Sequence, residues 1–71
     1  MTNWEIVTED GHYIGRADAH APEAAFCQCM VVKGYRVEEN TVTSKRRDDG
    51  SFLITHEDTS YVLTGARTPA V

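Results

Sequence analysis

The feature that most constrains the fold is one stretch, residues 21–34, because no other segment of the 71-residue chain has the length and pattern of a helix. Pro22 stands where a first-turn proline is tolerated, and Glu23 beside it complements the positive end of the helix dipole. Lys33 and Gly34 are typical of the other end, since glycine adopts the left-handed cap conformation without a side-chain cost. The sequence therefore predicts one helix of about three turns.

The helical projection divides this segment into two faces. A step of about 100° per residue gathers an apolar stripe that is expected to lie on a sheet. The stripe consists of Ala25, Phe26, Cys29, Met30 and Val32. The back of the helix carries two apolar side chains and is expected to contact a second copy or another protein, although single exposed apolar residues are also ordinary. This candidate surface consists of Ala24, Cys27, Gln28 and Val31.

The remaining chain shows the period-two alternation of strands. Two Asp-Gly pairs, Asp10-Gly11 and Asp49-Gly50, predict two β-hairpins, because both positions of such a turn accept positive φ. Gly15 is expected to mark a bulge or the close approach of another element. The predicted strands are residues 4–8, 13–17, 41–46, 51–56 and 61–64.

Between the helix and the second hairpin, the alternation begins again at Tyr35. Val37 and Val42 have opposite parity, so the extended stretch from Tyr35 cannot keep one register. A bulge, or a break into two strands, is therefore expected at residues 38–40.

The element order predicts an α+β fold: a single helix packed on one face of a four- to five-stranded antiparallel sheet, in the order β-β-α-β-β-β. The four-stranded alternative makes residues 9–17 a loop. Residues 1–64 are expected to form a single domain, and residues 65–71, which lack periodicity, a disordered C-terminal tail. The core is expected where the helix meets the sheet, at Phe26, Met30, Ile54 and Leu63.

Composition narrows the functional classes. The chain is 41% hydrophobic and 25% charged, has no apolar run long enough to cross a membrane, and begins without a signal-peptide pattern, so a cytoplasmic protein is expected. The net charge of −4 opposes general nucleic-acid binding, which would need a local basic patch. A core of this size is marginal and gains from a second subunit.

The residues that usually carry chemistry form no recognisable constellation. Cys27 and Cys29 project about 200° apart on a helix, so they cannot pair with each other, and their spacing does not match a C-x-x-C site. His12, His20 and His56 are scattered singly. No catalytic residue, metal site, cofactor or enzymatic activity is therefore expected.

Charge is concentrated at the predicted turns. The only basic cluster is Lys45-Arg46-Arg47, which Arg36 would extend if its strand lay alongside, and which Asp48-Asp49 partly cancels. Acidic doublets are common in exposed turns, so we interpret those of this chain as turn residues. The alternative is that they form a negative surface that binds a basic groove of another protein. The doublets are Glu9-Asp10, Glu38-Glu39, Asp48-Asp49 and Glu57-Asp58.

The layout of residues 21–63 resembles that of small phage-encoded anti-CRISPR proteins: an Ala-rich helix, a glycine, a Val/Thr strand, a D-G hairpin, an aliphatic strand, an acidic turn and an aromatic strand. The resemblance implies an inhibitor, carried by a phage or mobile element, that binds a CRISPR–Cas complex and blocks its contact with nucleic acid without catalysis. The resemblance contains no residue-by-residue match, so it assigns no functional residue to this chain. We therefore expect a small non-enzymatic protein-interaction module; the alternative is a nucleic-acid-binding module that uses Lys45–Arg47.

Overall fold

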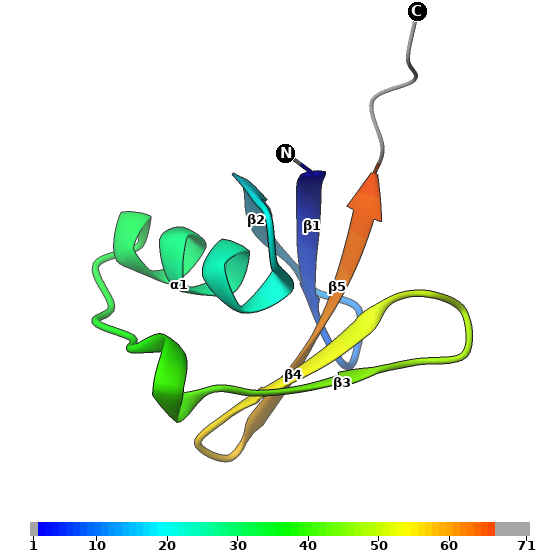
Figure 1. Cartoon of the computed structure of the whole chain (residues 1–71). Coiled ribbons are helices and arrows are strands. Elements are labelled where there is room, and N and C mark those ends of the chain that lie inside the picture. The colour runs from blue at the N-terminus through cyan, green and yellow to red at the C-terminus, as the bar shows by residue number, and fades with distance from the viewer. Residues whose placement is uncertain (1, 67–71) are drawn as a thin grey trace, which may run out of the picture.

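The computed structural model describes residues 2–66, which form a five-stranded antiparallel sheet and one α-helix (Figure 1). The elements are β1 (Thr2–Thr8), β2 (Tyr13–Ala19), α1 (Pro22–Val32), the 3₁₀ helix η1 (Glu39–Thr41), β3 (Thr43–Arg46), β4 (Phe52–His56) and β5 (Thr59–Ala66). The strands lie in the order β2-β1-β5-β4-β3, so β5 joins the two predicted hairpins into one sheet. The α+β class and the element order are confirmed, and the four-stranded alternative is wrong.

Helix α1 begins and ends where the sequence predicts. Pro22 is its first residue, and Gly34 follows its end with φ of 93°. The N–H of Gly34 donates to the carbonyl of Val31 at 3.0 Å, and that of Tyr35 donates to the carbonyl of Met30 at 2.9 Å. This pair of bonds is a Schellman motif, which satisfies carbonyls that the helix end would otherwise leave unpaired.

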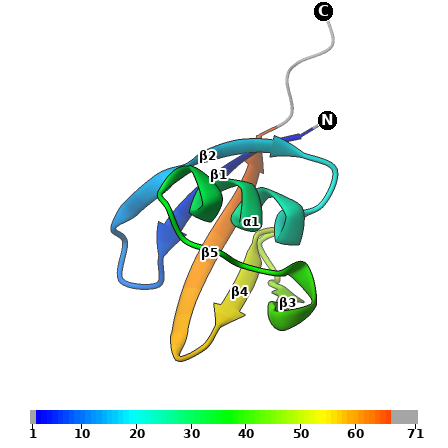
Figure 2. The ribbon, with the colours of Figure 1, turned by 90° about the vertical axis from the view of Figure 1, so that its left-hand side faces the viewer.

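Helix α1 covers one face of the sheet, and the core lies between them (Figures 1 and 2). The four residues predicted to meet there are all buried, and the Phe26 ring lies 4.8 Å from the ring of Tyr61 between centroids. The buried apolar residues are Trp4, Ile6, Ala19, Ala25, Phe26, Cys27, Cys29, Met30, Ile54 and Leu63.

Two predictions for the faces of the helix are wrong. Cys27, predicted to point outward, is only 9% exposed, and Ala24 is half-buried against the core, whereas Val32, predicted to point inward, is 87% exposed. The helix is covered by η1 as well as by the sheet, which buries the side that carries Cys27. Val32 lies instead at the hollow between α1 and β2, which nothing in the described residues fills. Burial, and to a smaller extent the charge of Glu39 of η1, raises the pKa of the Cys27 thiol.

The segment after α1 is not the predicted strand. Residues 35–38 have no strand pairing, and the chain turns through η1 before β3 begins at Thr43. The expected interruption at residues 38–40 is thus a break. It allows Val37 and Val42, which have opposite parity, both to pack against the core.

Both Asp-Gly pairs turn hairpins, as predicted, but the turns contain three residues. Gly11 and Gly50 have φ of 99° and 88°, while neither aspartate has a positive φ. The N–H of Gly11 donates to the carbonyl of Thr8 at 2.9 Å, and that of Gly50 to the carbonyl of Arg47 at 3.1 Å. Each is a turn followed by a left-handed glycine, the common three-residue hairpin loop.

Strands β2 and β5 are longer than predicted. β2 continues to Ala19. β5 reaches Ala66, and Gly65 is paired with Trp4, so the first two residues of the predicted tail belong to a strand. The rest of the predicted tail, residues 67–71, lies outside the described residues. Gly15 lies next to a register shift between β1 and β2, as expected for a bulge. It also lies against Cys29 of α1, so the predicted close approach of another element is confirmed as well.

Candidate interaction surface

The two faces of the sheet differ in what covers them. In β1, Trp4 and Ile6 are buried on the face that α1 covers, so the alternate residues Glu5 and Val7 lie on the other face. The part of the chain that the structure describes has its only α-helix on the first side. We call the second side the helix-free face.

An apolar row crosses the helix-free face. Val7 is paired with Tyr13 of β2 and with Val62 of β5, and Val62 is paired with Leu53 of β4. Lys45 of β3 is paired with Leu53 and ends the row. The two valines and the leucine are half-buried, and Tyr13 is 61% exposed. We call Tyr13, Val7, Val62 and Leu53 the apolar row.

A polar network borders this row on β1 and β2. Arg16 donates from Nη2 to Glu5 Oε2 at 2.9 Å and from Nη1 to Asn3 Oδ1 at 2.8 Å. Asn3 donates in turn to Asp18 Oδ1 at 2.9 Å. These groups are exposed, so the network fixes side-chain positions and adds little to the free energy of unfolding.

The other end of the row opens into a hollow of about 580 Å³ beside the β3–β4 hairpin. In Figure 1 this hairpin is inclined to β1 and β2. The predicted basic cluster lines this hollow, but three carboxylates share it. The lining residues are Glu9, Lys45, Arg46, Arg47, Asp48, Asp49 and Leu53. Among residues 2–66, Arg16 forms an ion pair with Glu5 and His12 lies close to Asp10, and none of the three hairpin cations lies within ion-pair distance of a carboxylate.

The hairpin turn holds one of these carboxylates in place. Asp49 Oδ1 accepts hydrogen bonds from the backbone N–H of Ser51 at 3.0 Å and from Ser51 Oγ at 2.6 Å. These bonds, and to a smaller extent the charge of Arg47, hold the pKa of Asp49 below its ordinary value. Asp49 therefore keeps a negative charge at the hairpin tip at neutral pH.

Arg36 does not extend the basic cluster, since the condition for this, a strand alongside the hairpin, is not met. Because residues 35–38 are not a strand, Arg36 does not lie alongside β3. It lines a different hollow of about 450 Å³, which also contains Met30, Tyr35, His56 and Tyr61. Of the predicted helix surface, Gln28 and Val31 are exposed, whereas Cys27 and Ala24 are not.

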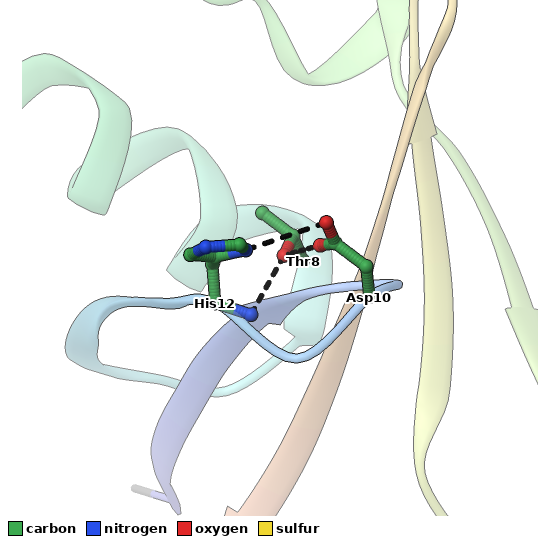
Figure 3. Close-up of polar contacts among 3 residues, drawn as sticks. All are labelled: Thr8, Asp10 and His12. Atoms are coloured by element: carbon green, nitrogen blue, oxygen red, sulfur yellow. Dashed lines mark hydrogen bonds and ion pairs between the residues drawn. The ribbon is translucent and has the colours of Figure 1, made fainter.

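A second cluster of functional groups lies in the β1–β2 turn (Figure 3). Thr8 Oγ1 hydrogen-bonds to Asp10 and accepts the backbone N–H of His12 at 2.9 Å, while His12 Nδ1 lies 3.3 Å from Asp10 Oδ2. The bonds from Thr8 and then His12 lower the pKa of Asp10. The threonine hydroxyl contacts the carboxylate rather than the imidazole, so His12 is not placed to activate it. This cluster stabilises a turn.

In the part of the chain that the structure describes, the remaining nucleophiles and metal-binding groups do not come together in a site either. Burial raises the pKa of the thiols of Cys27 and Cys29, which makes both poor nucleophiles. Within residues 2–66, no three His, Cys, Asp or Glu side chains are close enough together to hold a metal ion.

The apolar row is the surface feature that the sequence analysis missed. Its signal was present, because Val7, Leu53 and Val62 all have the parity opposite to that of the core residues in their strands. Alternation places each on the helix-free face, but only the cross-strand register shows that they are neighbours.

Comparisons of the chain with protein-family models, with curated proteins and with solved structures find no match. No helix within residues 2–66 is long and apolar enough to cross a membrane. The geometry of the helix-free face is therefore the basis for assigning a function.

Proposed function

We propose that this chain is a small non-enzymatic interaction module that binds another protein through the helix-free face. The observation that carries the proposal is the apolar row, which runs across four adjacent strands and has no helix of residues 2–66 over it. Apolar side chains surrounded by polar groups are typical of protein interfaces, where the apolar centre supplies most of the affinity. Leu53 stands where this row meets the mixed-charge hollow.

The charges around the row favour a protein over a nucleic acid. Lys45, Arg46 and Arg47 share their hollow with Glu9, Asp48 and Asp49, and the whole chain has a net charge of −4. A phosphate backbone would approach three carboxylates as well as three cations, which removes most of the electrostatic gain. A protein surface that carries charges of both signs can match this arrangement.

The resemblance to phage-encoded anti-CRISPR proteins supports a specific form of this proposal. In that form the chain is an inhibitor carried by a phage or mobile element, and it acts in the cytoplasm. It binds a host defence complex with the helix-free face and obstructs that complex's contact with nucleic acid. The binding itself blocks the complex, so no catalytic step is required.

Capture with two matched variants tests the proposal. Leu53→Asp places a charge in the apolar row, whereas Asn40→Asp adds the same charge to exposed η1 beside the helix. We expect tagged wild type and Asn40→Asp to retain the same partner from a host lysate and Leu53→Asp to lose it, with all three proteins folded by circular dichroism. Equal capture of that partner by Leu53→Asp would refute binding through the row.

The second candidate is a nucleic-acid-binding module, which the absence of ion pairs at Lys45, Arg46 and Arg47 within the described residues favours. Titration with short duplex and single-stranded oligonucleotides at about 50 and about 200 mM salt separates the two candidates. Micromolar binding that weakens with salt and is lost when all three cations are replaced by alanine would favour the second candidate. We expect no such binding.

A further inference from the structure

The outer edge of β2 is open to a further strand. β2 is the last strand of the sheet, seven residues long, and no other described strand pairs with its outer side. The opposite edge strand, β3, has four exposed residues that include Lys45 and Arg46, a pattern that discourages edge pairing. β2 has no lysine or proline, and its two charges, Arg16 and Asp18, have opposite sign.

The helix does not close this edge. A hollow of about 270 Å³ separates β2 from the outer side of α1, with Gly15 and Ala17 on one wall and Gln28 and Val32 on the other. Val32 lines this hollow and is 87% exposed, so its side chain is available to an added element. An added strand would cover the backbone of β2 and bring apolar surface against Val32.

The sequence of β2 is complementary to itself. When two copies of the strand pair antiparallel with Ala17 opposite Ala17, each Arg16 stands opposite Asp18 of the other copy. Both side chains lie on the helix-free face, since Asn3, on that face of β1, hydrogen-bonds to each of them. Arg16 already donates to Glu5 and Asn3, and its guanidinium has five N–H groups in all, so it can also bond across the pair.

We propose that β2 pairs antiparallel with β2 of a second copy about a two-fold axis at Ala17. The five strands of each copy then form one continuous sheet, and the two α1 helices lie beside each other with their Val32 side chains in the shared groove. Gly15, Ala17 and Ala19 keep the helix side of this junction small enough for the helices to approach. The helix-free face stays open in the dimer.

A charge-exchange experiment tests both the dimer and its register. Residue 16 of each copy stands opposite residue 18 of the other, so the dimer has two such pairs. In Asp18→Arg both pairs become Arg opposite Arg, and in Arg16→Asp both become Asp opposite Asp. We expect each single variant to weaken self-association by about tenfold, measured by sedimentation equilibrium over a concentration series. We expect an equimolar mixture of the two variants to recover the wild-type dimer, because every pair across the axis is again Arg opposite Asp.

Lys45→Asp on the other edge is the control and should leave the dimer unchanged. A wild type that remains monomeric up to about 1 mM, or a mixture that associates no better than the single variants, would overturn the proposal. A measurement on the wild type alone guards against a folding defect in a variant: amide hydrogen exchange at residues 14–18 should slow as the protein concentration rises. Exchange that is independent of concentration would also overturn it.

Discussion

At the scale of single residues, Gly15 sets how closely α1 approaches the sheet. A Cβ atom at this position would lie 2.8 Å from Sγ of Cys29, nearer than non-bonded atoms tolerate. We expect Gly15→Ala to lower the free energy of unfolding by about 1–3 kcal/mol through overpacking. Urea denaturation of Gly15→Ala in a Cys29→Ala background should show less than half of this loss, and equal losses in the two backgrounds would contradict the contact.

Phe26 is the largest fully buried side chain of the core. Its ring lies 4.8 Å from that of Tyr61 and 5.9 Å from that of His56, between centroids. We expect Phe26→Ala to cost about 3–5 kcal/mol, from lost transfer free energy and a residual cavity, which is enough to unfold much of so small a domain. Thermal melting measures the effect, with Gln28→Ala on the exposed side of α1 as control. A melting temperature unchanged by Phe26→Ala would show that the helix face is assigned wrongly.

At the scale of elements, the β4–β5 turn contains a backbone conformation that suits glycine. Glu57 has φ of 55° in a two-residue turn between His56 and Thr59, which are paired. A side chain in this left-handed region costs about 1–2 kcal/mol, part of which glycine recovers. We expect Glu57→Gly to raise the free energy of unfolding by about 0.5–1 kcal/mol in urea denaturation.

Glu38→Gly is the matched control for the turn, because Glu38 has φ of −99° and needs no glycine. It should leave the free energy of unfolding unchanged or lower it slightly. The conformation of the turn would be in doubt if Glu57→Gly lowered the stability by as much as Glu38→Gly.

The β3–β4 turn should respond to acid. The folded state holds the pKa of Asp49 below its ordinary value through the bonds from Ser51, so Asp49 stabilises the fold above the unfolded pKa of about 4. This contribution is lost as the pH falls through the lower, folded pKa. We expect Asp49→Asn to show a smaller decrease in urea midpoint between about pH 6 and about pH 3 than wild type. Identical decreases would mean that Asp49 does not contribute.

Local signals predicted most of these elements. Pro22 and Gly34 mark the bounds of α1 because capping depends on the residues at the helix ends, and Gly11 and Gly50 mark the hairpins because their turns need a left-handed residue. Cys27 was misplaced because its burial depends on η1, a segment more than ten residues away in the chain. Helical projection has no information about such a neighbour.

The candidate site was predictable only in part. The cluster Lys45–Arg47 is contiguous in sequence and lines a hollow. The placement of Arg36 beside this cluster required a strand that does not form, and Arg36 lines a different hollow. The apolar row joins residues from four strands, and its existence depends on β5 lying between β1 and β4. That order is a property of the whole sheet, which no local pattern specifies.

At the scale of the whole molecule, α1 covers one face of the sheet and leaves the other, on which we propose that the partner binds. The proposed dimer pairs the backbone of β2, whereas the proposed partner contacts the helix-free face around Leu53, three strands away, so the dimer would present two copies of that face. Two linked copies would bind a repeated or two-fold target more tightly than one. Variants at Asp18 and at Leu53 should therefore impair self-association and partner binding independently.

We propose that the helix-free face is the binding surface, and amide-resolved NMR shows residue by residue which part of the chain a partner covers. The ¹⁵N-labelled chain is titrated with the partner that wild type captures and Leu53→Asp does not. We predict shifts or broadening at Val7, Leu53 and Val62 and at their neighbours along β1, β4 and β5, with α1 and η1 unaffected. Perturbations confined to α1 and η1, with the strands unchanged, would contradict the claim.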